Sequence, residues 1–250
     1  MNESNNSIHM TLIEHLTELR KRLVFSAYAC VAGMIFCYNF SEPIFNWVRQ
    51  PIAKYLPMGG LVFTAPADKF IAHIKISFFG GLILSCPFWL YQLWKFIAPG
   101  LYSREKKYSL AFILTGAFLF CTGILFAYYV VFPMAFHFLM GYGGDIDKPM
   151  ITIDMYLSFF VTTTLMFGLA FEMPLVIVIL GTMGIISSRF LRDKRRYAVV
   201  VLAIISGVIT PPDLLSMLMM LVPMVIMYEA SLWIVYFIVK KQTKASLQYE

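Results

Sequence analysis

The sequence has little charge and lacks the motifs of soluble enzymes. Only 14% of its 250 residues are Asp, Glu, Lys or Arg, whereas 60% are hydrophobic and the mean hydropathy is +0.74. The four cysteines form no Cys-x-x-Cys pair and the four histidines have no metal-ligand spacing. There is no His-Glu-x-x-His, Gly-x-Ser-x-Gly or phosphate-binding loop. We therefore expect no enzyme activity, no cofactor and no metal site.

Long apolar runs predict an all-α membrane protein. The runs are apolar on every face, whereas membrane-spanning strands would alternate in hydropathy. At roughly 20 residues for each helix that crosses a bilayer, the chain has room for six transmembrane helices in one domain, residues 1–250. We place them at 23–40, 70–96, 109–140, 155–188, 197–210 and 214–239. An amphipathic helix over 8–22 precedes the first span and a tail over 240–250 follows the last.

The basic residues predict the orientation of these spans. Of the 20 lysines and arginines, 15 lie before the first span, after the last, or in and around the second and fourth connections between spans. Because cytoplasmic segments carry the excess of Lys and Arg, both termini are expected in the cytoplasm. The net charge of +6 then reflects topology. We expect no nucleic-acid partner.

The predicted spans differ greatly in length. The third holds 32 residues, roughly 48 Å as a helix, and the fifth holds 14, roughly 21 Å. A hydrocarbon core of about 30 Å forces the long spans to tilt, kink or project. We therefore expect an uneven bundle, with a thinned or partner-filled membrane beside the fifth and sixth spans.

Two acids fall inside predicted spans. Glu172 has no other charged residue within 155–188, and Glu229 lies in the sixth span. Pro174, two residues after Glu172, predicts a kink. An isolated carboxylate in hydrocarbon is costly, which favours a working site, although a hydrogen-bonded carboxyl that holds helices together is the simpler alternative.

Three polar segments flank the spans. Glu18 stands on the amphipathic helix, where it can pair with Lys21 or Arg22. Glu105 is the one acid of a basic connection, with Phe96 nearby, and can complement a helix N-terminus. Asp213 follows two prolines and is well placed as a helix cap. Each motif alone has such a structural explanation.

Taken together, these segments resemble the TatC family, the signal-recognition subunit of the twin-arginine protein translocase. The resemblance extends in order from the first leucine-rich helix to the sixth span. It rests on five motifs: His15-Leu-x-Glu18-Leu-Arg20-x-Arg22, Pro51, Phe96-Ile-Ala-Pro-x-Leu-Tyr102-x-x-Glu105, Phe171-Glu172-x-Pro174 and Thr210-Pro-Pro-Asp213. Many relatives carry Gln four residues after the Asp of the last motif, where this chain has Met217.

The resemblance implies a concave, glove-like bundle with short fifth and sixth helices in the bacterial inner membrane. Its implied partners are the single-span TatA and TatB subunits, the twin-arginine signal peptides of folded substrates, membrane lipids and further copies of the chain. Transport would be driven by the proton-motive force. The implied signal-peptide site contains Glu18, Glu105, Arg20, Pro51 and Phe96.

For the remaining motifs, the resemblance implies that Glu172 is a polar residue inside the concave face and that Asp213 stands at the tip of the last hairpin, with Thr210 available to a partner helix. Two alternatives stay open. The first is a proton-coupled small-solute transporter with Glu172 as the relay, against which the chain shows no internal repeat. The second is a scaffold whose in-span acids only assemble partners.

Overall fold

The computed structural model describes residues 12–56, 60–97, 109–141, 150–182, 185–209 and 214–246, which are almost entirely helical. Within these ranges the β-structure is limited to an isolated parallel β-bridge between Val62 and Thr152. The elements are α1 (Leu12–Tyr38), α2 (Ser41–Val48), α3 (Gln50–Ala53), α4 (Asp68–Leu84), α5 (Cys86–Ile97), α6 (Ser109–Phe126), the π-helix η3 (Ala127–Val131), α7 (Phe132–Gly141), α8 (Ile153–Phe171), α9 (Met173–Thr182), α10 (Ser188–Asp193), α11 (Arg195–Ile209) and α12 (Leu214–Ser246).

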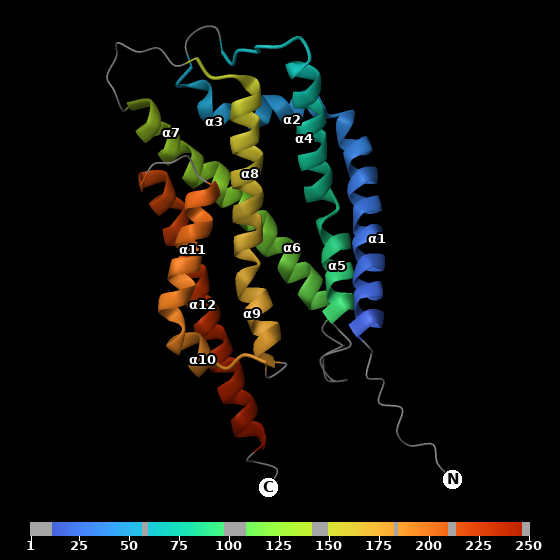
Figure 1. Cartoon of the computed structure of the whole chain (residues 1–250), viewed down its shortest axis with the longest axis vertical. Helices are drawn as coiled ribbons and strands as arrows, with labels where there is room; N and C mark the ends of the chain where they lie inside the picture. The colour runs from blue at the N-terminus through green and yellow to red at the C-terminus, as the bar shows by residue number, and fades with distance from the viewer. Residues whose placement is uncertain are drawn as a thin grey trace.

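The helices form one bundle with two distinct ends (Figure 1). We call the end where α1 begins and α12 finishes the terminal end, and the opposite end, crossed by α2 and α3, the cap end. Helices α1, α4 and α5 lie on one side, α8 and α9 in the middle, and α11 and α12 on the other side (Figure 1). The α6–α7 segment crosses obliquely behind α8, so this long segment is strongly tilted.

Four described helical segments are long and apolar enough to cross a membrane, and the bent pair α4–α5 makes a fifth if it counts as one span. The expected fifth span corresponds to α11, whose 15 residues extend about 22 Å. This length is below the thickness of an ordinary hydrocarbon core. The chain is therefore an all-helical, multi-pass membrane protein with one unusually short helix.

Two expected element boundaries differ in the structure. The predicted surface helix 8–22 and first span 23–40 form a single helix, α1, because no Gly or Pro interrupts it before Gly33. The resemblance implied a short sixth helix, but α12 is 33 residues long. The Lys-rich sequence after the span contains no helix breaker before Ser246, so the helix continues.

The predicted span 70–96 is also not one helix. It divides at Ser85 into α4 and α5, which meet at a bend of 56°. Pro87 explains the position, because its ring lacks an N–H and disfavours helical geometry in the residue before it. The bend directs α5 toward the start of α6 at the terminal end (Figure 1).

The two longest segments are interrupted as well. The π-helix η3 separates α6 from α7, and Glu172 separates α8 from α9, two residues before Pro174. At this break the Glu172 N–H donates to Leu169 O, a tighter bond than the regular helical one. The expected irregularity near Pro174 is thus present, and it sits on the acid itself.

Glycines bring helix backbones into direct contact at two places. A Cβ on Gly81 of α4 would lie 2.4 Å from the backbone nitrogen of Met34 in α1, and one on Gly33 would lie 2.7 Å from Gly81 O. A Cβ on Gly123 of α6 would lie 2.5 Å from Phe167 O in α8. Neither contact leaves room for a methyl group. Small residues of this kind are how membrane helices approach closely.

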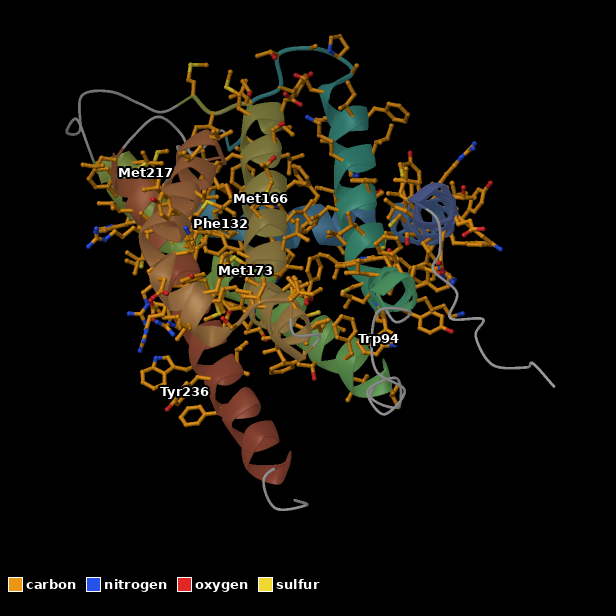
Figure 2. All side chains as sticks on the ribbon, turned by 60° about the horizontal axis from the view of Figure 1, so that its bottom comes forward. Trp94, Phe132, Met166, Met173, Met217 and Tyr236 are labelled. Carbon is orange, nitrogen blue, oxygen red and sulfur yellow. The ribbon has the colours of Figure 1, made fainter. Side chains whose placement is uncertain are left out.

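Aromatic rings fill the core where α4, α7 and α8 meet. Phe160 of α8 stacks on Phe132 of α7 at 4.6 Å between ring centroids and meets Phe79 of α4 edge-on at 5.9 Å. All three side chains are fully buried, and Figure 2 shows Phe132 inside the bundle. This cluster joins the two sides of the molecule through α8.

Two tyrosine hydroxyls fasten the cap helices to the bundle. Tyr128 Oη donates to Trp47 O at 3.0 Å, and its ring stacks on Trp47 with centroids 4.0 Å apart. Tyr156 Oη, from α8, donates to Val48 O. These bonds supply donors to carbonyls in the last turn of α2, where the regular helical donors run out.

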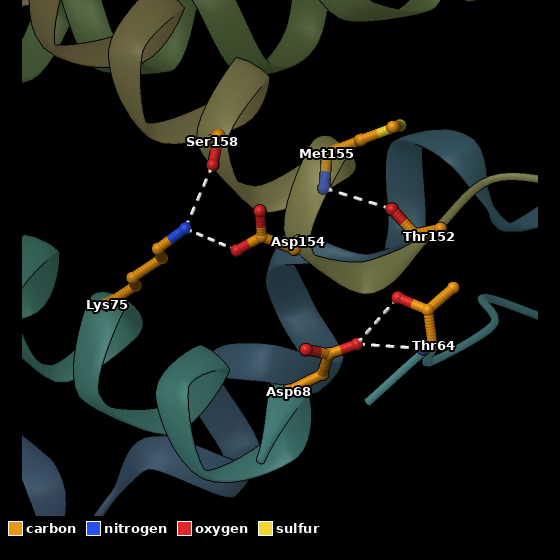
Figure 3. Close-up of polar contacts among 7 residues, drawn as sticks. All are labelled: Thr64, Asp68, Lys75, Thr152, Asp154, Met155 and Ser158. Atoms are coloured by element: carbon orange, nitrogen blue, oxygen red, sulfur yellow. Dashed lines mark hydrogen bonds and ion pairs between the residues drawn. The ribbon is translucent and has the colours of Figure 1, made fainter. Parts of the chain in front are cut away.

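A second polar group joins α4 to α8 near the cap end (Figure 3). Lys75 Nζ contacts Asp154 Oδ1 at 2.5 Å and Ser158 Oγ at 3.0 Å. Asp68 accepts from the backbone and hydroxyl of Thr64, which closes the turn that leads into α4. Lys75 falls inside the second predicted span. Its charge is therefore compensated by Asp154, which lies 79 positions away in the sequence.

We predict that Gly81→Ala destabilises the protein by about 1–3 kcal/mol, because the new methyl group meets backbone atoms of α1 that cannot rotate away. The thermal unfolding midpoint in detergent measures the effect. Gly207→Ala in α11 is the matched control, since its Cβ would meet only Met217 Sδ at an ordinary 3.5 Å. Equal midpoints for both variants would contradict the close α1–α4 contact.

Candidate functional site

A polar cluster lies where α1 and α5 meet at the terminal end. Arg22 Nη2 donates to Glu18 Oε1 at 2.9 Å, one helical turn away, and Arg22 Nη1 makes a long contact of 3.4 Å to Gln92 Oε1 on α5. The side chains are largely covered, with 17% of Glu18 and 24% of Arg22 exposed. Gln92 is buried. The cluster thus fixes the position of a carboxylate between two helices.

One oxygen of this carboxylate lacks a hydrogen bond within the described part of the chain. Glu18 Oε2 is buried and has no hydrogen-bond partner among the described residues, and neither has Arg22 Nε. A buried carboxylate oxygen without a donor is costly, so the site favours an additional donor, best of all a cationic one. The arrangement can therefore accept an incoming guanidinium or ammonium group.

The end of α5 is held firmly next to this cluster. Trp94, two residues after Gln92, is buried and packs on Phe112 of α6, with ring centroids 4.6 Å apart. Figure 2 shows Trp94 at the start of α6. Phe96 is half-buried near the end of α5. The connection that follows, with Glu105, lies outside the described residues.

The structure does not bring all the expected recognition residues together. Arg20 lies on α1 near Glu18 with an exposed side chain. Pro51 is buried in α3, at the cap end, on the opposite side of the molecule from Glu18 (Figure 1). Because the bundle separates the two ends, Pro51 can contribute to the polar cluster only through the stability of the fold.

Glu172 is buried at the junction of α8 and α9. Its side chain faces Gly116 of α6, where a Cβ would lie 3.3 Å from Glu172 Oε2 and 3.0 Å from Leu90 Cδ1. Only 7% of the residue is exposed, and Oε1 has no hydrogen-bond partner among the described residues. The glycine makes room for a carboxyl group that the surrounding leucines cannot satisfy.

Glu229 has a different environment from Glu172. Its Oε2 accepts from Arg195 Nη2 of α11 at 2.8 Å, and 35% of its side chain is exposed. We expected it as an in-membrane polar residue, and the structure adds a cationic partner from α11. The partner was hidden in the basic connection before the fifth span.

The last hairpin is only partly described. Thr210 and Asp213 lie outside the described residues. Met217, in the first turn of α12, is half-buried and faces Gly207 of α11. The contact between the two helices at this position is thus apolar.

Sequence reasoning missed two polar groups that the fold assembles. Lys75 and Asp154 are far apart in sequence, and no local spacing signals their pairing. Arg189, Arg192 and Arg195 line a common hollow with α12, although their sequence pattern indicated only topology. The three-residue spacing of Arg189 and Arg192, which places both on one face of α10, is a signal that could have indicated a shared surface.

Comparisons with known proteins support one family. The model of the family described as Sec-independent protein translocase protein (TatC) matches residues 14–223. The TatC protein of Carboxydothermus hydrogenoformans is 43% identical over 234 residues, which cover 93% of this chain and 96% of that protein. The TatC protein of Aquifex aeolicus is 38% identical, covering 90% of this chain and 94% of that protein.

The fold agrees with a solved structure of the same kind. The crystal structure described as twin arginine translocase receptor TatC has a TM-score of 0.81 and 37% sequence identity to this chain. The similarity covers 90% of this chain and 99% of the solved one. The likeness therefore extends over nearly all of both chains.

We predict that Glu172→Leu raises the free energy of unfolding by about 1–3 kcal/mol, because it removes a buried oxygen that lacks a partner. The thermal unfolding midpoint in detergent provides the measurement. Glu172→Gln is the control: it keeps a buried polar group and should not stabilise. A lower midpoint for the leucine variant would mean that the carboxyl group makes a stabilising bond.

Proposed function

Since this chain belongs to the TatC family of Sec-independent protein translocase proteins, we propose that it is the subunit that binds twin-arginine signal peptides of folded substrates. The observation that carries the proposal is the Glu18 carboxylate, held by Arg22 with one oxygen left without a donor. The site binds and orients a peptide, and we propose no catalytic step for it.

We propose that the chain crosses the bacterial inner membrane six times, with both termini in the cytoplasm. The described helices pass alternately between the two ends, and the short α11 accounts for the fifth pass (Figure 1). The basic clusters of α1 and α10 both lie at the terminal end, which supports a cytoplasmic position for that end. The oblique α6–α7 segment supports a bundle with a concave face.

The chemistry of the signal sequence fits the polar cluster at this end. A guanidinium donates through a planar fork that a carboxylate accepts with both oxygens, whereas the ammonium group of Lys cannot reproduce this geometry. Glu18 would receive one arginine of the signal and Glu105 the other. The nearby positive charges of Arg20 and Arg22 would repel any cation, so only one that gains the forked bonds to the carboxylates would be retained.

The aromatic residue at the end of α5 has a supporting role in the proposal. Phe96 would cover the bound arginines, and Arg20 would set the local charge. Pro51 would act from a distance by stabilising α3 at the cap end. Glu229 would hold α11 against α12 through Arg195 and would not contact the signal.

For the transport step we propose that Glu172 is a polar contact on the concave face, reached by the signal peptide or a partner helix only when the residues that bury it move apart. TatA and TatB, both single-span subunits, would dock beside α11 and α12, where the short helix leaves a mismatched edge. Thr210 and Asp213 would lie at the tip of that hairpin. Several copies of the chain would share one receptor complex, and the proton-motive force would drive transport.

We predict that Glu105→Gln abolishes binding of an Arg-Arg signal peptide to the detergent-purified chain and that Glu18→Gln weakens it at least about tenfold, the loss expected for a charge-assisted bond. Glutamine keeps the shape of each side chain and an acceptor for Arg22 but removes the charge. The dissociation constant of a labelled peptide is the measurement.

Glu14→Gln is the matched control, because Glu14 is an exposed acid one turn earlier on α1. A Lys-Lys version of the peptide is the second control and should bind no variant well. Undiminished binding to the Glu18 and Glu105 double variant would refute the proposed site.

We predict that Glu172→Leu slows export of an Arg-Arg reporter several-fold while the purified variant binds the signal peptide normally. The physical reason is that leucine preserves the packing against Gly116 but removes the polar group. Export rates from intact cells and peptide affinity of the same variant are compared. Loss of both would show that the substitution disturbs the fold instead.

A further inference from the structure

A hollow of about 560 Å³ opens between α10, the start of α11 and the second half of α12. It is lined by Arg189, Arg192, Arg195, Leu232, Trp233 and Tyr236. One wall is cationic and the other is aromatic and aliphatic. Figure 2 shows Tyr236 projecting from the side of α12, far from Trp94.

The cationic wall has more arginines than paired carboxylates. Arg195 is paired with Glu229, but none of the ion pairs among the described residues involves Arg189 or Arg192. Two positive charges therefore face the hollow without a carboxylate. Arg195 contributes further, since its Nε is buried and has no hydrogen-bond partner among the described residues. Guanidinium groups in this arrangement suit a phosphate group, which accepts forked hydrogen bonds.

The hollow is formed before any ligand arrives, because α10 is held against α12. Tyr228 Oη donates to Leu191 O at 2.7 Å, and the Leu191 side chain is buried. Ser187 caps α10 by accepting a hydrogen bond from the Phe190 N–H at 3.1 Å. A fixed α10 keeps Arg189 and Arg192, three residues apart, on one face.

The aromatic wall points to a ligand that is partly in the membrane. Trp233 is 56% exposed and stacks on Phe237, and the same helix exposes Val222 and Ile226 nearer its start. This face of α12 is too apolar for water and fits lipid chains. Trp and Tyr gather at the membrane–water boundary, which places the hollow at headgroup depth.

From these observations we propose that the hollow binds the phosphate group of an anionic phospholipid in the leaflet at the terminal end. The arginines contact the phosphate, while Trp233 and Tyr236 lie against the glycerol and the first part of the acyl chains. Basic pockets beside transmembrane helices take anionic headgroups in this way. The site is separate from the signal-peptide site and does not depend on it.

The test uses the full-length chain in lipid nanodiscs made of phosphatidylcholine with a minor fraction of phosphatidylglycerol. Native mass spectrometry after release counts the phosphatidylglycerol molecules retained on each protein. We expect Arg189→Gln with Arg192→Gln to lower retention about tenfold, because each cation at the membrane surface contributes to anionic lipid binding. Retention of phosphatidylcholine should not change.

The matched control is Lys194→Gln with Arg196→Gln, which removes the same charge from exposed neighbours that do not line the hollow. Retention near the wild-type level in this control supports the site. Equal losses in both double variants would overturn the proposal, since they would mean diffuse attraction to a basic surface. All four positions are exposed or at the rim, so the variants should keep the wild-type unfolding midpoint.

Two further arms distinguish a lipid from other anions. Trp233→Ala should reduce phosphatidylglycerol retention. The affinity for inorganic phosphate should be weak in the wild-type chain and the same in the Trp233→Ala variant. Displacement of the lipid by inorganic phosphate at equal concentration would overturn the lipid assignment. Displacement by a short poly-glutamate peptide under the same conditions would do so as well and would identify the hollow as a peptide site.

Discussion

Direct contact between helix backbones is the constraint on which this structure depends. In surroundings as apolar as its own side chains, a membrane bundle gains little from hydrophobic burial and must gain from close packing. Gly33 and Gly81 bring α1 onto α4, and Gly123 meets α8 beside Phe167. The phenylalanine cluster then joins α4 to α8. The position of the Glu18 carboxylate beside α5 follows from this packing, because α5 continues from α4.

Features that depend on long apolar runs were predicted correctly from the sequence. Some bends and helix ends, which depend on breaks within those runs, were not. The all-helical class and the tilt of the long third segment follow from hydropathy and length. The 56° bend at Ser85 was not predicted, because Pro87 is equally compatible with a mild kink inside one continuous span. The continuity of α1 was missed because the charges of residues 18–22 resemble the end of a surface helix, although nothing in the backbone interrupts it.

The candidate site was predictable where it uses neighbours one helical turn apart. The Glu18–Arg22 pair follows from spacing, whereas its contact with Gln92, 70 positions away, requires the fold. The partner of Glu229 was equally hidden, because Arg195 belongs to a cluster that topology alone explains. Pairings across helices depend on packing geometry, which a single sequence does not encode locally.

The two tyrosine hydrogen bonds that hold α2 at the cap end, called the clamp here, affect how the protein tolerates substitutions. Both tyrosine hydroxyls donate to main-chain oxygens, those of Trp47 and Val48. Every amino acid carries such an oxygen, so the acceptor side of the clamp survives any substitution that keeps the end of α2 in place. The donor side does not, because only Tyr128 and Tyr156 supply the hydroxyls. The hydrogen bonds of this joint therefore depend on two side chains in the bundle, while α2 contributes its backbone and the Trp47 ring that stacks on Tyr128.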